Sequence, residues 1–532
     1  MTTSPLGENF PPELAKEAMT DSRALVAKLV AGSNVLRDSG VNMYEYTEQL
    51  TYLLFLKMAD ERATRPLNPE RVVPEELSWH RLLGLSGEAL EDTYNHILRG
   101  LASQPGVLGS IYRGAQNKIS NPSHLKTLIV DYIDKENWSA AGADVNGDAY
   151  EELLERSAGD SKSTAGQYFT PRPLIQAMVD VVQPTIEDTV VDPACGTGGF
   201  LLDAYAYVTG RTRTGTAVRT RSLRTAAGFT PEEQKHLRSK FVTGVDIGAT
   251  TSRLASMNLL LHGLGSITGD SLIDSRDALV ADPGERWSVV LANPPFGRSS
   301  SSDIGGADDD GAEIFRQDFV VTTSNKQLNF LQHIMTILDI NGRAAVVLPD
   351  NVLFEGGAGE VLRRKLLTAF DLHTLLRLPT GIFYKPGVKA NVLFFDKKPA
   401  AENPWTQRLW VYDLRTNKHF TLKKSPLRRS DLDDFVDAYL PGKPRDERVD
   451  TGKDGRWQSF TYDELIERDK VNLDITWLRD ESLEDADNLP SPEIIAREIV
   501  EDLTGALAEF EAVAAALEAR ASTDDATDSK VS

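Results

Sequence analysis

The sequence predicts an α/β protein in which an open sheet follows a mostly helical N-terminal region. Apolar residues recur at helical spacing over the first part of the chain, and short runs rich in β-branched residues alternate with helical segments after it. A long Ala/Glu-rich amphipathic segment lies near the C-terminus. We therefore expect a flexible N-terminus (1–20), a helical N-terminal domain (21–158), an α/β domain (159–480), a C-terminal helical region (481–520) and a disordered tail (521–532).

The helical domain is predicted from segments such as "MYEYTEQLTYLLFLKMADERA", "EALEDTYNHILRGLA" and "SHLKTLIVDYIDKENW". Each repeats apolar residues three or four positions apart, as an amphipathic helix does. Aromatic residues such as Tyr46, Tyr52 and Phe55 are interpreted as helix core. The polar stretch "SAGDSKSTAG" ends this domain.

The sheet is predicted from six short apolar runs, which are "DTVVDPACGTGGF", "KFVTGVDI", "RWSVVLANPPFG", "GRAAVVLPDNVLF", "LHTLLRLP" and "VKANVLFFDKK". Helical segments such as "TSRLASMNLLLHG" and "NFLQHIMTILDI" separate most of them. Continuous apolar runs are typical of parallel strands that are buried on both faces. From about residue 400 the strand pattern weakens, and 418–429 forms a basic patch.

Charge and composition limit the class of protein. The net charge of −21 argues against a protein that grips nucleic acid over its whole surface, although a local basic cleft or a partner subunit remains compatible with it. The single cysteine, Cys195, excludes an internal disulfide and a cysteine-rich metal site, and no metal is expected. No apolar run is long enough for a membrane span and the first residues do not form a secretory signal, so we expect a cytoplasmic protein.

A glycine-rich turn follows the first predicted strand. In "VVDPACGTGGF", Asp192 ends the strand, and Gly196, Gly198 and Gly199 let the backbone approach a ligand closely. The turn is neither a Walker loop nor a dinucleotide fingerprint, and a purely structural turn is the alternative. Asp246 ends the next strand, where nucleoside-binding α/β folds place an acid on the ribose.

These features favour a nucleoside without phosphates over NAD, and S-adenosylmethionine is such a ligand. The insert 209–240, between the turn and the second strand, is basic. It is interpreted either as a solvated loop or as a contact to a DNA backbone.

The stretch "VVLANPPFG" places Asn293, Pro294, Pro295 and Phe296 at the carboxyl end of a strand, where open α/β sheets bind ligands. The prolines fix φ, so the Asn293 amide oxygen and the Pro294 carbonyl are two acceptors held at set angles. An exocyclic NH2 group has two donors to match them. Phe296 offers a face on which a base can stack, and a duplex base reaches such a site only by flipping out.

Two other stretches contain candidate residues. In "AGQYFTPRPLI", Thr170 before Pro171 suits a helix N-cap, and Tyr168 with Phe169 suggests an aromatic clamp over a ligand. "GSITGDSL" ends in Asp270 after an expected strand, where the carboxylate can accept from the adenine amino group of a cofactor or simply form a turn.

The order "GQYFTPR", "DPACGTGGF", "GVDI", "GDSL", "NPPF" resembles the gamma-class amino-methyltransferases. Over about residues 20–515 the chain resembles the modification (M) subunits of type I restriction–modification systems, which are adenine-N6 DNA methyltransferases. The resemblance implies a Rossmann-like S-adenosylmethionine-dependent domain with catalytic residues Asn293, Pro294, Pro295 and Phe296. It implies cofactor contacts at Gln167, Tyr168, Phe169, Thr170, Pro171, Arg172, Thr197, Gly198, Gly199 and Asp246.

The family resemblance also implies partners. Two M subunits flank a specificity (S) subunit that reads the double-stranded DNA site, and a restriction (R) subunit can join. The acidic charge is then compatible with DNA binding if segments 209–240 and 418–429 face the duplex, and the C-terminal helix would pack on the S subunit. Two alternatives stay open: a protein glutamine-N5 methyltransferase, which also acts on an NH2 group, and a non-catalytic subunit that keeps the cofactor pocket.

Overall fold

The computed structural model describes residues 28, 31–32, 35, 43–64, 69, 71–136, 138, 150–151, 153–154, 169–210, 228–266, 269–296, 313–383, 388–422 and 424–479. The chain divides into two units, Met1–Trp477 and Leu478–Ser532. The expected flexible N-terminus, the C-terminal helical region and the tail lie outside the described residues. The fold below is therefore that of the first unit.

The N-terminal helices are α2 (Met43–Ala63), α3 (Gly87–Ala102), α4 (Gly106–Tyr112) and α5 (Pro122–Thr127), and a π-helical turn (Leu128–Ile133) extends α5. Their apolar faces meet in one cluster, which contains Tyr46, Tyr52 and Phe55 as expected. Asn121 caps α5 by accepting from the Ser123 N–H, and Pro122 occupies its first turn.

The remaining helices are α7 (Arg172–Val182), α8 (Gly199–Thr209), α9 (Pro231–Ser239), α10 (Ala249–Leu261), α11 (Lys326–Ile337), α12 (Asn351–Phe354), α13 (Ala358–Ala369), α14 (Asp433–Tyr439) and α15 (Tyr462–Ile466). The strands are β1 (Val190–Asp192), β2 (Val242–Asp246), β3 (Ile273–Ser275), β4 (Trp287–Ala292), β5 (Leu338–Pro349), β6 (Phe370–Arg377), β7 (Ala390–Lys397), β8 (Arg408–Asp413) and β9 (Trp457–Thr461).

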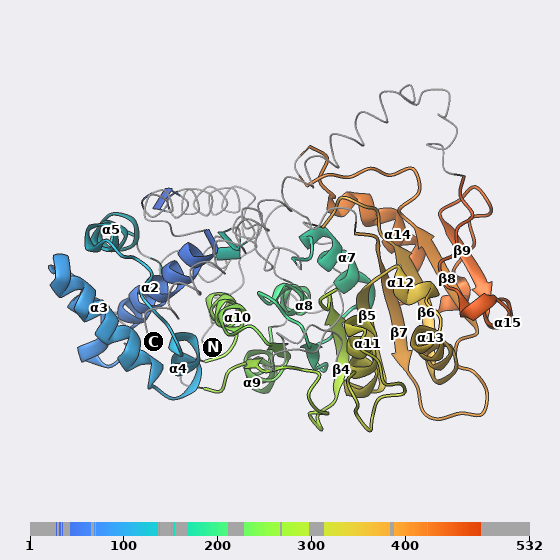
Figure 1. The fold of residues 1–532 in the computed structure, drawn as a ribbon, viewed down its shortest axis with the longest axis horizontal. Coiled ribbons are helices and arrows are strands. Elements are labelled where there is room, and N and C mark those ends of the chain that lie inside the picture. The colour runs from blue at the N-terminus through green and yellow to red at the C-terminus, as the bar shows by residue number, and fades with distance from the viewer. Residues whose placement is uncertain are drawn as a thin grey trace, which may run out of the picture. The chain divides into compact units, whose positions relative to one another are not determined.

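Within the described residues these nine strands form one sheet in the order β3-β2-β1-β4-β5-β7-β6-β8-β9 (Figure 1). Strands β1 to β5 run parallel, but β7 is antiparallel to both of its neighbours and β9 is antiparallel to β8. Because β6 is antiparallel to β7, it runs in the same direction as β5, and β8 is parallel to β6. Of the six strands predicted from the sequence, the expectation of parallel strands is therefore correct for β1, β2, β4, β5 and β6 and wrong for β7. A strand buried on both faces has no alternation from which its direction can be read.

Helices cover both faces of the sheet. Helices α7, α8 and α14 pack with Val289 and Leu291 of β4, whereas α11 and α13 pack with Val290 and Ala292 of the same strand (Figure 1). Successive residues of β4 thus enter different cores, because side chains in a strand alternate between its faces. Residues 289–292 of this central strand are apolar, and the polar residues Ser288 and Asn293 stand on either side of them.

Helix α10 belongs to two cores at once. Ala255 and Leu259 pack with the sheet, while Leu254, Met257 and Leu261 join the cluster of the N-terminal helices. Arg253 of α10 pairs with Glu48 of α2 and donates to the Arg113 carbonyl at 2.8 Å. The N-terminal helices are therefore anchored to the helix that follows β2.

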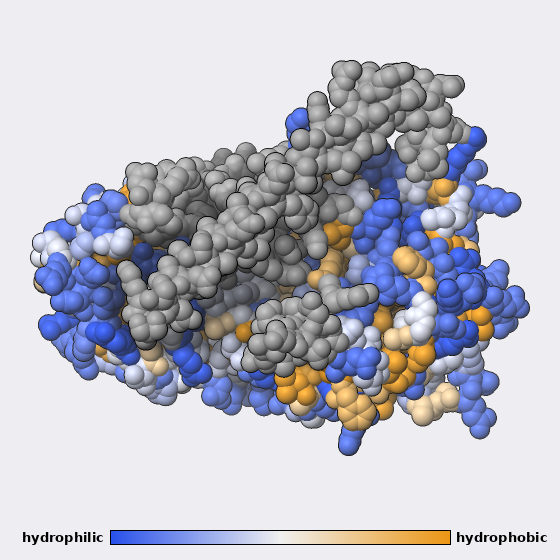
Figure 2. All heavy atoms as spheres, in the orientation of Figure 1, coloured by the Kyte–Doolittle hydropathy of each residue, from blue (hydrophilic) through white to orange (hydrophobic). Residues whose placement is uncertain are grey.

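Strands β8 and β9 come from the region in which the strand pattern of the sequence weakens. Trp410 and Trp457 stack with ring centroids 5.3 Å apart, at the antiparallel pairing of the two strands. None of the helices in the described part of the chain has the length and apolarity needed to traverse a bilayer. In the view of Figure 2, the surface over α3 and α5 is mostly hydrophilic, in keeping with the high charged content.

Arg363 on α13 holds the C-terminal end of this unit in place. Only 1% exposed, it donates to the carbonyls of Val352, Glu355, Lys470 and Val471 at 2.6–2.9 Å. Burial lowers the pKa of its guanidinium to about 10, so it remains charged at neutral pH. The next residue, Arg364, has an exposed side chain, and its one ion pair within the described part of the chain is with Glu360 one turn away.

We predict that Arg363→Leu lowers the free energy of unfolding by ~3 kcal/mol or more, because four carbonyls lose their donor and those of Val352 and Val471 are buried. The matched control, Arg364→Leu, is expected to change it by less than ~0.5 kcal/mol, since it removes one surface pair. Urea unfolding followed by tryptophan fluorescence measures both. Equal effects of the two substitutions would contradict the role of Arg363.

Candidate active site at the carboxyl edge of the sheet

The candidate site lies where the strand order reverses. From β1 the chain builds outward to β2 and β3, then returns to place β4 on the other side of β1. Ligands of open α/β sheets bind at such a switch point, beyond the carboxyl ends of the strands. Here β1 ends at Asp192, β2 ends at Asp246, and Asn293 follows the end of β4. The sequence therefore predicted correctly that these side chains share one edge.

The turn after β1 requires glycine, as the sequence predicts. The reason at Gly196 is its positive φ rather than close approach to a ligand. Gly196 (φ 54°) and Gly198 (φ 86°) occupy the left-handed region, which disfavours residues with a Cβ. An added Cβ would meet nothing within 4 Å at Gly196. Backbone conformation therefore explains this glycine without a close ligand. Asn258 of α10 donates to the Thr197 carbonyl at 2.9 Å, and this bond holds the turn against α10.

The two acids beside this turn follow neighbouring strands; Asp192 is buried and Asp246 is half-buried. Asp246 accepts from the N–H groups of Gly196 (3.1 Å) and Gly248 (2.8 Å), and Asp192 accepts from Ala194 (3.0 Å). Burial, and secondarily the charge of Asp246, raises the pKa of Asp192 to about 8, and burial also raises the pKa of Asp246. Neither acid has a basic partner among the described residues. The pair therefore suits a ligand that brings hydroxyl groups or positive charge.

Among the residues that the structure describes, the side chain of Asn293 makes one hydrogen bond. Its Nδ2 donates to Thr170 Oγ1 at 2.8 Å, and both residues are buried, with 7% and 8% exposed. Its Oδ1 is also buried, and it has no hydrogen-bond partner among the described residues. A buried acceptor without a donor is costly unless a ligand supplies one. The amide oxygen is therefore available for a donor from outside the chain.

This contact corrects the expected N-cap role of Thr170. Helix α7 begins at Arg172 with Pro171 in the cap position, and no side chain caps it. The Pro171 carbonyl accepts from Leu174 and Ile175, so the cap is made by the backbone. The hydroxyl of Thr170 is thus free to bind the amide across the sheet edge.

The rest of the Asn-Pro-Pro-Phe motif forms the wall beside Asn293. Pro294 is buried, and Pro295 and Phe296 are half-buried. The Phe296 ring meets that of Phe383 edge to face, with centroids 6.5 Å apart, so the orientation of Phe296 is supported from one side. A half-buried aromatic face next to a free acceptor is a suitable surface for a planar base.

Of the stretch before α7, the structure describes the residues from Phe169 onward. Gln167 and Tyr168 lie outside the described residues, and Phe169 is half-buried. Arg172, expected among the cofactor contacts, places its guanidinium 3.1 Å from the carboxylate of the buried Glu151. At least one of its bonds is therefore internal to the protein.

Asp270 does not lie where the sequence placed it. The expected strand before it is wrong: β3 begins at Ile273, after Asp270, so this exposed residue lies at the amino end of the strand. Its neighbour Gly269 accepts from Val107 of α4, on the side of the N-terminal helices.

Asp277 lies at the carboxyl end of the same strand instead, two residues after Ser275, which is paired with Asp246. It accepts from Leu279 N–H at 2.8 Å. The sequence contains Asp-Ser-Leu at Asp270 and Asp-Ala-Leu at Asp277, so the local pattern did not discriminate between them. The shorter distance along the chain from Asp277 to the Asn-Pro-Pro-Phe motif was the available signal.

Comparison with known proteins agrees with this geometry. Residues 141–482 match the family model described as N-6 DNA Methylase, and residues 25–131 match that of the HsdM N-terminal domain. The chain belongs to the N-6 DNA methylase family. Within it, the chain is 37% identical to the type I restriction enzyme StySJI methylase subunit of Salmonella typhimurium and 36% identical to the EcoKI methylase subunit of Escherichia coli, each over 92% of this chain and 94% of the relative.

Solved structures extend the likeness to the fold. The modification subunit of a putative type I restriction enzyme from Vibrio vulnificus has a TM-score of 0.67 at 26% identity, covering 87% of this chain and 98% of that one. A chain from a type I restriction–modification assembly has a TM-score of 0.65 at 26% identity, covering 93% and 98%. The N-6 methylase fold of this chain is thus shared over nearly its whole length.

The two basic segments of this N-6 methylase both expose basic side chains, and the second also contains a buried arginine. Arg238 and Lys240 are exposed, while residues 211–227 lie outside the described part. In 418–429, Lys418, Lys424 and Arg428 are exposed. Arg429 is instead buried and pairs with Asp180 and Asp433, so it is not available to a phosphate.

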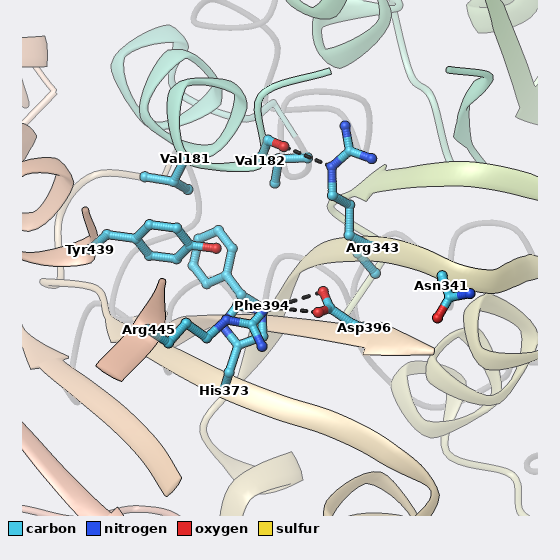
Figure 3. Close-up of a pocket in the computed structure, with 10 residues that line it drawn as sticks. Val181, Val182, Asn341, Arg343, His373, Phe394, Asp396, Tyr439 and Arg445 are labelled. Atoms are coloured by element: carbon cyan, nitrogen blue, oxygen red, sulfur yellow. Dashed lines mark hydrogen bonds and ion pairs between the residues drawn. The ribbon is translucent and has the colours of Figure 1, made fainter. Parts of the chain in front are cut away.

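A cavity of about 150 Å³ lies away from this site, at the amino-terminal half of β5 (Figure 3). Its Arg343 is in register with Val289 of β4, whereas Ala292, next to Asn293, is in register with Val346. Arg445 pairs with Asp371 and Asp396, and Arg343 pairs with Asp188. These charges already have partners in the fold, so the cavity is a polar packing feature rather than a second reaction centre.

We predict that Asp192 makes stability fall with pH. Because its pKa is about 8 in the folded chain and near 3.8 ordinarily, the native state binds more protons than the unfolded state in this window. Its contribution is therefore complete below about pH 4 and is lost as pH rises to about 8. The stability difference between Asp192→Asn and the parent should grow between pH 5 and 8, because asparagine does not titrate. Thermal unfolding of the two proteins across this range measures this difference, and a constant difference would contradict the prediction.

Proposed function

We propose that the protein is a site-specific DNA methyltransferase that methylates the N6 amino group of adenine, using S-adenosylmethionine, as the modification subunit of a type I restriction–modification complex. The observation that carries the proposal is the buried, unpartnered Asn293 Oδ1 at the switch point of the sheet. Membership of the N-6 DNA methylase family and the type I methylase subunits among its relatives support the substrate class.

The residues at the sheet edge fit the methyl donor. The positive-φ glycine turn, together with buried Asp192 and half-buried Asp246, offers backbone groups and carboxylates to a ligand with ribose hydroxyls and a positive charge. Asp246 would hold the ribose, and the turn at Thr197 to Gly199 would lie against the cofactor. When bound, S-adenosylmethionine supplies an electrophilic sulfonium methyl group, and the C–S electron pair leaves with sulfur as the adenine nitrogen attacks.

Asn293 would act on the attacking nitrogen. Its Oδ1 and the Pro294 carbonyl accept the two N–H bonds of the flipped adenine, which frees the nitrogen lone pair from the ring and aims it. Phe296, braced by Phe383, supports the face of the base. Asn293 and Pro294 accept hydrogen bonds only and take no proton, so the proton of the methylated amine passes to water. A preorganised acceptor of this kind contributes ~3–4 kcal/mol, and alignment supplies much of the rest.

We infer that the chain works with partners. Its relatives are named as subunits of restriction enzymes, and one similar chain belongs to a type I assembly. One specificity subunit, flanked by two modification subunits, would read the double-stranded DNA, and a restriction subunit can join the complex. The C-terminal helical region, 481–520, is the segment we propose for contact with the specificity subunit.

The first test is Asn293→Ala. We predict that transfer of labelled methyl groups from S-adenosylmethionine to duplex DNA falls by about 10²–10³-fold, while the Kd for the cofactor changes little. The parent complex with its specificity subunit provides the reference, and sequencing of modified bases identifies the product. Label in protein and none in DNA would favour the glutamine methyltransferase instead. A near-parental rate would remove the role of Asn293 and favour a non-catalytic pocket.

The second test compares the two acids near β3. We infer that Asp277, rather than Asp270, accepts from the adenine amino group of the cofactor, because it lies at the carboxyl end of β3 beside Asp246. Asp277→Ala is predicted to raise the cofactor Kd by about 5- to 100-fold, the effect of losing a charge-assisted hydrogen bond. Asp270→Ala is predicted to leave it unchanged. Calorimetric titration with S-adenosylhomocysteine measures both, and the reverse order of effects would restore the assignment made from sequence.

A further inference from the structure

The hydrogen bond between Thr170 and Asn293 gives the amide a direction. An Asn side chain has a donor end and an acceptor end of nearly equal shape, and only the acceptor end can bind an amino group. In the structure Nδ2 donates to Thr170 Oγ1, which leaves Oδ1 on the unpartnered side. If the amide were reversed, Nδ2 would face the donors of the substrate amine and repel it.

Thr170 is well placed to hold this direction. The residue is buried, and it precedes Pro171, whose ring fixes φ and whose carbonyl accepts two N–H groups of α7. The hydroxyl is therefore attached to the start of a helix rather than to a mobile loop. The amide stands on the other side, fixed by β4 and by the two prolines that follow it. Both ends of the bond are rigid.

We propose that Thr170 is the positioning residue of the catalytic amide, and that it keeps Asn293 Oδ1 directed at the adenine amino group. This inference rests on the proposed function and differs from the cofactor contact that the family resemblance implies for Thr170. The two roles separate cleanly. A cofactor contact acts on the affinity for S-adenosylmethionine, whereas a positioning contact acts on the rate of methyl transfer to bound DNA.

The experiment uses the complex with its specificity subunit and duplex DNA that carries the target site. Single-turnover methyl transfer is measured for the parent, Thr170→Val and Thr170→Ser, together with the Kd for S-adenosylmethionine and the melting temperature of each. We expect Thr170→Val to slow transfer by about 10- to 100-fold with the Kd within about twofold, because a buried amide donor loses its acceptor. Thr170→Ser, which keeps the hydroxyl, is expected to restore most of the rate.

A double-substitution cycle excludes a merely structural effect. In the Asn293→Ala background there is no amide to orient, so adding Thr170→Val is expected to leave the residual rate unchanged. If Thr170→Val unfolds the protein, Thr170→Ala replaces it in the same cycle. The inference is overturned if the valine variant transfers at the parental rate, if a raised Kd accounts for the whole loss, or if the two substitutions act independently. A parent complex that leaves adenine unmodified removes the proposed function, and this inference with it.

Discussion

Burial of the parallel strands on both faces is the constraint on which the site depends. Strands β1 and β4 pass between two large apolar cores, and β2 places Val242 in one of these cores and Val245 in a smaller cluster. Charged groups in the middle of these strands would therefore have a large desolvation cost. The charged and amide side chains of β1, β2 and β4 stand where each strand leaves the core. Because parallel strands end at the same edge, Asp192, Asp246 and Asn293 meet there, although about a hundred residues separate the first from the last. The parallel arrangement of the buried strands thus brings these polar side chains together at one edge of the sheet.

Helix α10 links this edge to the N-terminal helices. One of its faces packs on the sheet and another packs into the N-terminal cluster, and Asn258 reaches the turn at Thr197. The pairing of Arg253 with Glu48 adds a charged contact between the same two parts. A displacement of the N-terminal helices would therefore move the helix that supports the glycine turn. The N-terminal helices therefore stabilise the candidate site through their packing on α10.

The sequence predicted those residues of the candidate site that have a local signal, and it did not predict contacts between residues far apart in the chain. Asn293, Asp192 and Asp246 were identified because each ends an apolar run, which is a local signal. The bond from Asn293 to Thr170 joins residues 123 positions apart, and Thr-Pro before a helix has the local pattern of an N-cap. Asp270 was named from the stretch "GSITGDSL", and the nearly identical tripeptide at Asp277 carries no local signal that sets it apart. Only the pairing of β3 with β2 shows which acid reaches the edge.

Several arginines of this acidic chain are bound inside the fold and are not available to DNA. Arg343, Arg363 and Arg429 are each committed to acids or carbonyls inside the fold, so counting basic residues overstates what the surface offers to a phosphate backbone. The exposed cations of the described basic segments are few, and Lys418, Lys424 and Arg428 are among them. Each phosphate contact adds affinity that falls with salt, so a few contacts give weak binding that does not read sequence. The proposed site would bind a single base, so a partner subunit that binds the duplex would supply most of the affinity and the sequence specificity.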